Sequence, residues 1–186
     1  MTATETTAGG VAAMRAAAAD ARSWLLDTAA PLWASRGRTG SGLFAERMTL
    51  AGVPDASYFR SFVQARHIFS FVACGGMGWD GPWRALVDET VSALLTHARR
   101  ADGFFVHKLA ADGAVIDGRA DLYDQAFIML GLAVAGEALD RPGLFDEAER
   151  LLSRIEDAWQ HPQGGFREGE IVDPSVRRQN PHMHLF

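Results

Sequence analysis

The chain has 186 residues, of which 48% are hydrophobic and 22% are charged, and its formal net charge at pH 7 is −5. This length and composition are typical of a soluble globular domain with a sizeable core. The acidic balance offers no basic surface for nucleic acid, and no stretch approaches the roughly 18 uninterrupted apolar residues of a membrane span. We therefore expect neither nucleic acid nor a membrane as a partner.

Residues 1–10 are rich in Thr, Ala and Gly and are expected to form a disordered tail, which leaves one domain over 11–186. This tail lacks a basic region followed by an apolar one, so it is not a secretory signal, and a cytoplasmic location is the default expectation. The single cysteine, Cys74, excludes an intramolecular disulfide and lies in an apolar helical stretch, where it should pack as a small hydrophobe.

Apolar residues at helical spacing predict a first helix over 11–36, bent at Pro31 because an interior proline removes a backbone hydrogen bond. The mixed segment 43–50 predicts a short extended stretch, and 53–55 predicts a turn. The second helix, 58–73, is apolar on nearly every side, which is typical of an inner helix.

Two polar residues interrupt the second helix. Arg66 is either a ligand-binding residue or one half of a structural ion pair, because a charged side chain on an inner helix needs a polar cavity or a partner. His67 is more typical of a hydrogen-bonded core histidine.

The later helices alternate between amphipathic and apolar. Helix 82–100 has one apolar stripe and one charged face, as an outer helix does; 121–138 is apolar on most sides; and 142–159 is amphipathic again. Between the first two, residues 102–117 predict a hairpin centred on 111–114.

A short extended segment over 164–172 should precede a sixth, inner helix. Asn180 is a good N-cap for this helix and Pro181 suits its first position, which places His184 one turn after Asn180 on the same side. A helix of one turn cannot hold itself together in water, so either this end frays or the natural protein continues past Phe186.

Two unlike motifs recur in step along the chain. In one series, Phe44, Phe105 and Phe166 follow glycine-containing segments at equal intervals. In the other, nearly equal intervals separate the triplets His67-Ile68-Phe69, Gln125-Ala126-Phe127 and His184-Leu185-Phe186. A shared period of about 60 residues indicates one duplicated unit of outer helix, glycine-aromatic hairpin and inner helix. Inner helices of such units can close into a ring, of which three units form an open arc.

Four separated motifs carry a resemblance. They are Trp79-Asp80-Gly81-Pro82-Trp83, the run from Arg119 to Phe127, the run from His161 to Glu168, and the run from Arg177 to Phe186. Together they resemble the N-acylglucosamine 2-epimerase superfamily, in the branch of mannose and mannose-6-phosphate isomerases. The resemblance implies an all-α fold, the (α/α)6 barrel, of which this chain supplies about half and ends at the start of the sixth helix.

Members of this superfamily interconvert aldoses with ketoses or epimerise sugars at C2, without a metal or other cofactor. Such chemistry needs imidazoles that move protons and fixed donors for the enediolate oxygens. The resemblance implies sugar-contacting roles for Arg66, Tyr123, Asn180 and His184, with His184 as a candidate acid/base helper. Gln125 occupies the equivalent inner-helix place, where its amide can hold a hydroxyl.

The superfamily's principal acid/base histidines lie on later inner helices, which this chain does not contain. His107, His161 and His182 lie in predicted loops or caps and are poor substitutes for them. We therefore expect part of a carbohydrate isomerase or 2-epimerase that acts on a hexose or hexose derivative. As a fragment it should be inactive and able to self-associate through the open edge of the half barrel.

Two alternatives stay open. One is a non-catalytic helical-repeat interaction module, whose apolar arc docks a partner. The other is a glycoside hydrolase on a similar helical toroid, which needs two carboxylates across the cavity. The available acids are Glu46, Asp124 and Glu168, and no two of them form a compelling pair.

Overall fold

The structure is a computed structural model that describes residues 3–185. Its helices are α1 (Ala3–Trp24), α2 (Ala30–Arg36), α3 (Ser61–Gly76), α4 (Trp83–His97), α5 (Leu122–Leu139), α6 (Gly143–Trp159) and the short α7 (Gln179–Met183). A π-helical turn, η1 (Leu25–Ala29), joins α1 to α2. The strands are two or three residues long: β1 (Arg47–Met48), β2 (Pro54–Asp55), β3 (Phe59–Arg60), β4 (Lys108–Leu109) and β5 (Val115–Asp117).

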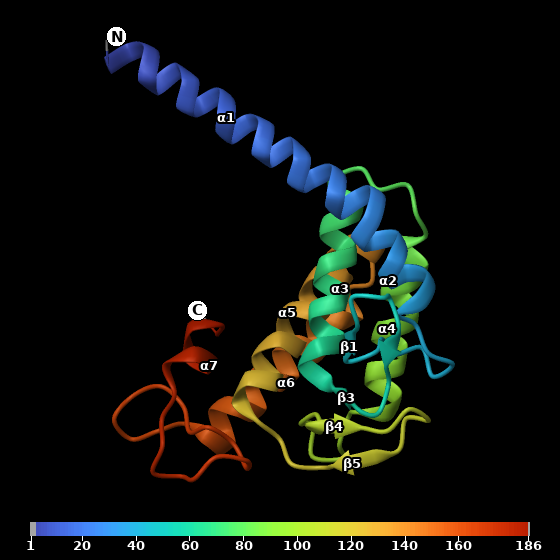
Figure 1. Ribbon diagram of the computed structural model, residues 1–186. Helices are drawn as coiled ribbons and strands as arrows, with labels where there is room; N and C mark the ends of the chain where they lie inside the picture. Colours follow the sequence, from blue (N-terminus) through green and yellow to red (C-terminus); the bar gives the residue numbers. More distant parts are fainter. Residues whose placement is uncertain (1–2, 186) are drawn as a thin grey trace.

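Helices α3 to α6 form two layers (Figure 1). The inner helices α3 and α5 pack against each other, α4 packs behind α3, and α6 packs behind α5. Gly131 of α5 permits this close approach, because a Cβ at that position would lie 3.1 Å from the Ala65 Cβ of α3. The alternation of outer and inner helices confirms the predicted half barrel.

Helix α5 is the core of this arrangement. It is long and apolar enough to cross a membrane by length and composition alone, yet 50% of this stretch is buried inside the protein. Leu122, Ile128 and Leu132 are fully buried in it, because α3 and α6 cover its flanks. Its apolar character therefore follows from its position between other helices.

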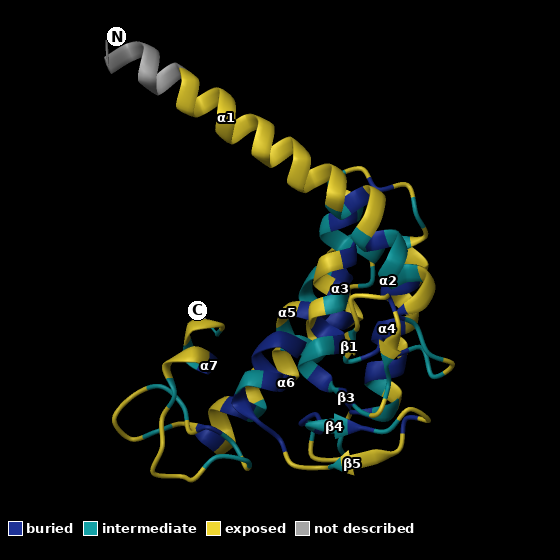
Figure 2. Ribbon diagram, in the orientation of Figure 1, coloured by how far each residue is buried: buried dark blue, intermediate teal, exposed yellow. Residues whose placement is uncertain are grey.

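Helix α1 projects away from the two layers, and its side chains are exposed from residue 9 almost to its end (Figures 1 and 2). The structure places residues 3–10 in this helix, where the composition predicts a disordered tail; Met1 and Thr2 lie outside the described residues. Residues 11–20, which follow in the same helix, are Ala-rich and have high helix propensity without tertiary contacts, and the helix extends from them toward the N-terminus. Near Pro31, whose N–H is missing, the backbone adopts the π turn η1, so the predicted irregularity is present.

Two hairpins lie beside the inner helices. β1 pairs with β2 with Arg47 opposite Asp55, so the prediction of a turn at 53–55 is wrong. The turn instead runs from Thr49 to Val53, where Gly52 has a φ of +74°. β4 pairs with β5, β3 pairs with the other edge of β4, and the Ala110 N–H donates to the Ala114 carbonyl at 2.7 Å, which confirms the predicted hairpin centre.

Three isolated bridges show the duplicated unit directly. They are Arg38–Phe44, Arg99–Phe105 and Gln160–Phe166, and they recur at equal intervals along the chain. Phe44 and Phe105 are fully buried, and Phe166 is half-buried against the same core. The glycine-aromatic series is therefore confirmed, although residues 164–172 contribute isolated bridges where a short extended segment was predicted.

Each of these phenylalanines is held by a side chain four residues after the N-cap of an inner helix. The N-caps are Arg60, Asp121 and Arg178. The Gln64 amide accepts from the Phe44 N–H at 2.7 Å and donates to its carbonyl at 2.9 Å, and Gln125 makes the same two bonds to Phe105 at 2.9 and 3.0 Å. In the third unit, Nε2 of His182 lies 3.0 Å from the nitrogen and 3.1 Å from the oxygen of Phe166.

The contacts of Gln64 with Phe44, Gln125 with Phe105 and His182 with Phe166 form a repeated clamp. Its register differs from the one that the sequence indicates for the second repeated motif. Gln125 corresponds to Gln64 and His182 in the structure, whereas the sequence series aligned it with His67 and His184. The N-caps of the first two units are further apart along the chain than those of the second and third. A shorter loop before α7 therefore shifts the third unit out of step, whereas the first two N-caps keep the interval that separates Phe44 from Phe105.

Candidate functional site

The candidate site lies where the inner helices α3, α5 and α7 begin. Carboxylates fix all three helix starts: Asp121 accepts a hydrogen bond from the Tyr123 N–H at 2.8 Å, and Glu46 accepts one from the Arg60 N–H at 3.1 Å. Glu168 does the same for Arg178 at 2.5 Å. Negative charge at the start of a helix is favourable because the first N–H groups are unsatisfied there.

Side chains from all three inner helices meet around Phe127. The His184 ring lies 4.6 Å from the Phe127 ring and 5.4 Å from the Tyr123 ring, centroid to centroid. The Arg66 guanidinium lies 5.4 Å from the Phe127 centroid, on the same cluster. A cation over an aromatic face is attracted by the ring's electron density. Arg66, Tyr123 and His184, far apart in the sequence, are thus brought together.

The other two predicted site residues differ in their availability. Asn180 is exposed on α7, one turn before His184, and the prediction that it is the N-cap is wrong, because the helix begins earlier and Arg178 holds that position. Gln125 is fully buried, and both of its amide atoms bond to the main chain of Phe105. The expectation that its amide holds a ligand hydroxyl is therefore wrong, and its role is to attach the hairpin to α5.

A groove of about 410 Å³ runs along α3 next to this cluster. Its lining includes Trp33, Glu46, Arg60, Phe62, Arg66 and His67. Glu46 is held by Arg60, whose Nε lies 2.5 Å from Oε1, so the free polar group at this edge is the Arg66 side chain. Aromatic faces with a few converging polar groups are typical of small-molecule sites.

His67 is a half-buried histidine with aromatic neighbours. Its ring lies 4.5 Å from the Phe44 ring and 4.7 Å from the Trp33 ring, and no hydrogen-bond partner is found for it among residues 3–185. Burial lowers the pKa of His67 to about 4, and the charge of Arg66 acts in the same direction. The neutral ring therefore packs as part of the core, in place of the hydrogen-bonded histidine that the sequence predicts.

A second histidine pairs with a buried acid. His107 Nδ1 lies 2.7 Å from Asp124 Oδ2, and the Asp124 side chain is 1% exposed. Burial raises the pKa of Asp124 to about 6, although the hydrogen bond from His107 acts in the opposite direction. The pair joins the β4 hairpin to the first turn of α5. His161 lies in a loop, where its Nδ1 accepts from the Gln163 N–H at 3.1 Å.

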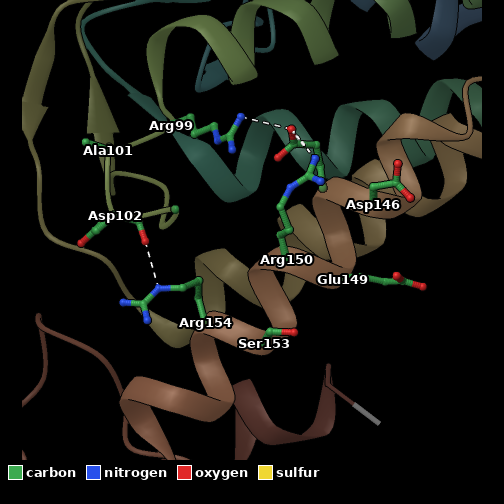
Figure 3. Close-up of a pocket in the computed structure, with 10 residues that line it drawn as sticks. Arg99, Ala101, Asp102, Asp146, Glu149, Arg150, Ser153 and Arg154 are labelled. Atoms are coloured by element: carbon green, nitrogen blue, oxygen red, sulfur yellow. Dashed lines mark hydrogen bonds and ion pairs between the residues drawn. The ribbon is translucent and has the colours of Figure 1, made fainter.

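Another pocket lies on the outer surface between the end of α4 and α6 (Figure 3). Its charged side chains neutralise one another: Arg99 and Arg150 both pair with Glu147, at 3.1 and 2.8 Å, and Arg154 donates to the Asp102 carbonyl at 3.0 Å. Such exposed pairs contribute little, and the two other acids of the lining, Asp146 and Glu149, are exposed on α6. The site at the inner-helix starts is the better candidate.

The ionic links among the inner-helix starts were not predicted from the sequence. Glu46, His107 and Glu168 each lie two positions after one of the three repeated phenylalanines, and this shared spacing is a signal that could have identified them. Their partners could not be found in this way, because Arg178 also reaches Asp121 of the neighbouring unit.

A family model and a curated relative identify the family of this chain. The sequence model described as N-acylglucosamine 2-epimerase (GlcNAc 2-epimerase) matches residues 42–186. A curated relative, mannose-6-phosphate isomerase of Rhizobium meliloti (strain 1021), is 36% identical over 166 residues. That match covers 88% of this chain and 43% of the relative, so the chain spans less than half of the relative's length.

Two solved structures show the same fold. Cellobiose 2-epimerase from Spirochaeta thermophila DSM 6192 superposes with a TM-score of 0.83 at 19% identity, over 93% of this chain and 47% of that one. A D-mannose isomerase superposes with a TM-score of 0.76 at 16% identity, over 88% and 43%. In both cases this chain corresponds to rather less than half of the other.

Proposed function

Because the chain belongs to the N-acylglucosamine 2-epimerase family, we propose that it forms one side of the sugar cavity of a carbohydrate isomerase or 2-epimerase. In this reaction a base removes the C2 proton next to the open-chain carbonyl and leaves an enediolate. Return of the proton to C1, with the O2 proton passing to O1, converts an aldose to its ketose, and return to the opposite face of C2 gives the epimer. The observation that carries the proposal is the meeting of Arg66, Tyr123 and His184 around Phe127.

Each residue has a role that its chemistry suits. The Arg66 guanidinium donates to a sugar oxygen and stabilises the charge of the enediolate, and Asn180 donates to or accepts from a hydroxyl. The Tyr123 hydroxyl holds a second sugar oxygen. His184 moves a proton at a sugar oxygen as an acid/base helper. No cofactor enters this scheme.

A second base on the other side of the cavity is also required for proton transfer at carbon. Within residues 3–185, His67, His107 and His182 are engaged by aromatic rings, by Asp124 and by Phe166. We therefore propose that the 186-residue chain alone does not catalyse the reaction. A cytoplasmic location stays a prediction.

The proposed ligand is a hexose or hexose derivative, and the names of the relatives suggest which to test first. The experiment is a titration of the isotope-labelled chain with mannose, mannose 6-phosphate and N-acetylglucosamine, followed by the NMR signals of the Tyr123 and His184 rings. We expect millimolar sugar to shift these signals, and Arg66→Ala to abolish the response. Glycerol at equal concentration is the control for nonspecific effects. If no hexose shifts these signals and the chain forms a stable complex with a protein partner, the interaction-module alternative is favoured.

The hydrolase alternative requires two free carboxylates, which the three acids considered from the sequence do not offer. Glu46 is held by Arg60, Glu168 by Arg178, and Asp124 by His107. These acids are consumed in joining hairpins to inner helices, so none of the three is available to attack or protonate a glycosidic bond.

A further inference from the structure

Arg178 connects two inner-helix starts that belong to different units. Its Nε donates to Glu168 Oε2 at 2.6 Å, and its Nη2 lies 3.0 and 2.9 Å from the two carboxylate oxygens of Asp121. The Glu168 and Asp121 side chains are 1% and 7% exposed. A guanidinium fork shared between two buried carboxylates has a fixed orientation, which a flexible surface pair lacks.

The Asp121 carboxylate has a second partner. Its Oδ1 also accepts from the Tyr123 N–H at 2.8 Å, as the N-cap of α5. One carboxylate thus holds the backbone of Tyr123 on one side and the side chain of Arg178 on the other. The start of α7 is tied to the turn of α5 that carries Tyr123.

Helix α7 depends on such ties because it is short. It spans five residues, and a helix of that length does not persist through its own hydrogen bonds. In the first unit, Arg60 holds Glu46 of its own hairpin, and α3 and α5 are held together by extensive packing along their length. Arg178 therefore links the third unit to the second. Helices α3 and α5 need no such link, because they already pack against each other along their length.

We propose that Arg178 is a positioning residue that fixes His184 against Tyr123 and Phe127. The inference deepens the proposed function, on which it rests for the meaning of these rings as sugar contacts. Rotation or fraying of α7 would move the His184 ring away from α5, while the α3, α5 and α6 core would stay intact. A working site requires placement of its groups to within about 0.5 Å, so loss of this link should disable His184 without removing it.

The test measures the ring contacts of His184 in the 186-residue chain. In the wild type, NMR cross-peaks should join the His184 ring to the Tyr123 and Phe127 rings, and His184→Gln assigns them. We expect Arg178→Gln to abolish these cross-peaks while those between Phe62 and Tyr123, 5.1 Å apart, remain. Arg178→Lys keeps the charge without the fork and should weaken the cross-peaks severalfold. Arg167→Gln is the matched control, because the exposed Arg167 side chain forms no ion pair or hydrogen bond within residues 3–185. In this variant the His184 cross-peaks should be as strong as in the wild type.

Asp121→Asn keeps the test decisive if Arg178→Gln fails to fold. The amide oxygen can still cap α5 through the Tyr123 N–H, while the ion pair to Arg178 is lost. Persistence of the His184 cross-peaks in either folded variant, or their equal loss in Arg167→Gln, would overturn the inference. Wild-type cross-peaks in a chain that responds to no hexose would count against the proposed function and leave the positioning role standing.

Discussion

Arg66 shows how a charged residue on an inner helix can be exposed and still be ordered. Its guanidinium lies over Phe127, and no carboxylate pairs with it among the described residues, which argues against the structural ion pair considered from the sequence. An exposed cation–π contact contributes about 0.5 to 1 kcal/mol. The side chain is therefore held loosely enough to exchange the ring for a ligand.

The first prediction follows from this weak attachment. Arg66→Ala should lower the melting temperature by no more than a few degrees, since only the cation–π contact is lost, and should abolish the hexose-induced NMR shifts. Differential scanning calorimetry and the sugar titration measure the two effects. Arg15→Ala, on the exposed face of α1, is the control for removal of one positive charge. Early melting together with an undiminished sugar response would reject the site role.

Asp124 supplies a prediction about pH. Burial raises its pKa from 3.8 to about 6 in the folded protein, against the effect of the His107 hydrogen bond; Asp121 and Arg60 also act on it. An acid with a higher pKa in the folded state binds its proton more tightly there. Asp124 thus stabilises the fold when protonated, below about pH 4, and this contribution is lost as the pH rises through about 6.

Asp124→Asn removes this titration and keeps an acceptor for His107. From pH 4 to pH 7, the free energy of unfolding of the variant should rise relative to that of the wild type, by at most roughly 3 kcal/mol. Urea unfolding at the two pH values measures the change. The control is Asp20→Asn, on exposed α1, whose free energy of unfolding should change with pH as that of the wild type does. Parallel curves for Asp124→Asn would show that His107 cancels the effect of burial.

At the scale of elements, the hairpins and inner helices are joined by a repeated clamp. Phe44→Ala and Phe105→Ala should each lower the free energy of unfolding by about 3 to 5 kcal/mol, because each removes a fully buried ring. Phe166→Ala should cost less, since Phe166 is half-buried. Chemical denaturation checks this order, with Phe69→Ala as the control, because Phe69 is 46% exposed. A larger loss for Phe166 than for Phe44 would contradict the ranking by burial.

The sequence predicted those features that depend on local pattern. Outer and inner helices differ in how apolar their surfaces are, and the glycine-aromatic segments keep a constant interval, so both could be recognised without a structure. The clamp register could not be, because the loop before α7 is shorter and moves His182 to the place of Gln64 and Gln125. A motif search compares spacings along the chain. The clamp residue is instead fixed by its position four residues after the N-cap of its inner helix.

The same limit applies to the candidate site. Arg66, Tyr123 and His184 were named through a family resemblance, and the structure places their side chains in one cluster. Gln125 was misassigned because a polar residue on an apolar helix has two explanations, a ligand or a main-chain partner. The sequence does not show that the Phe105 main chain lies within hydrogen-bond distance.

At the scale of the whole molecule, the α5 and α6 edge is an open flank. A groove there is lined mainly by apolar side chains, and Leu130, Phe145 and Leu152 are each about 40% exposed. The preceding inner helix, α3, has the corresponding flank covered by α5. Contiguous apolar surface of this kind usually marks an interface or promotes aggregation. A second copy of the chain can cover it in solution.

We expect the isolated chain to be catalytically silent. His184 is the C-cap of a five-residue helix, and a second base facing it across the cavity is absent from residues 3–185. In deuterated water, NMR should therefore show no deuterium at C2 of mannose or at C1 of fructose above the uncatalysed rate. His184→Ala is the control for trace contaminating isomerase, because exchange that survives in this variant comes from elsewhere. Exchange that is seen with the wild type and lost with His184→Ala would refute the expectation.

The open flank leads to the last prediction, which concerns self-association. The mass measured by light scattering should rise with concentration, because the exposed apolar flank gains burial in a dimer at about 25 cal/mol per Å². Leu152→Glu places a charge in the centre of this groove and should return the chain to a monomer without loss of helix content by circular dichroism. Leu50→Glu is the matched control: Leu50 is fully exposed in the β1–β2 turn, outside the groove, so the same substitution there should leave association unchanged. If both variants are monomeric, the added negative charge and not the groove explains the dissociation. If the wild type is a monomer at all concentrations, the flank stays uncovered and the prediction is wrong.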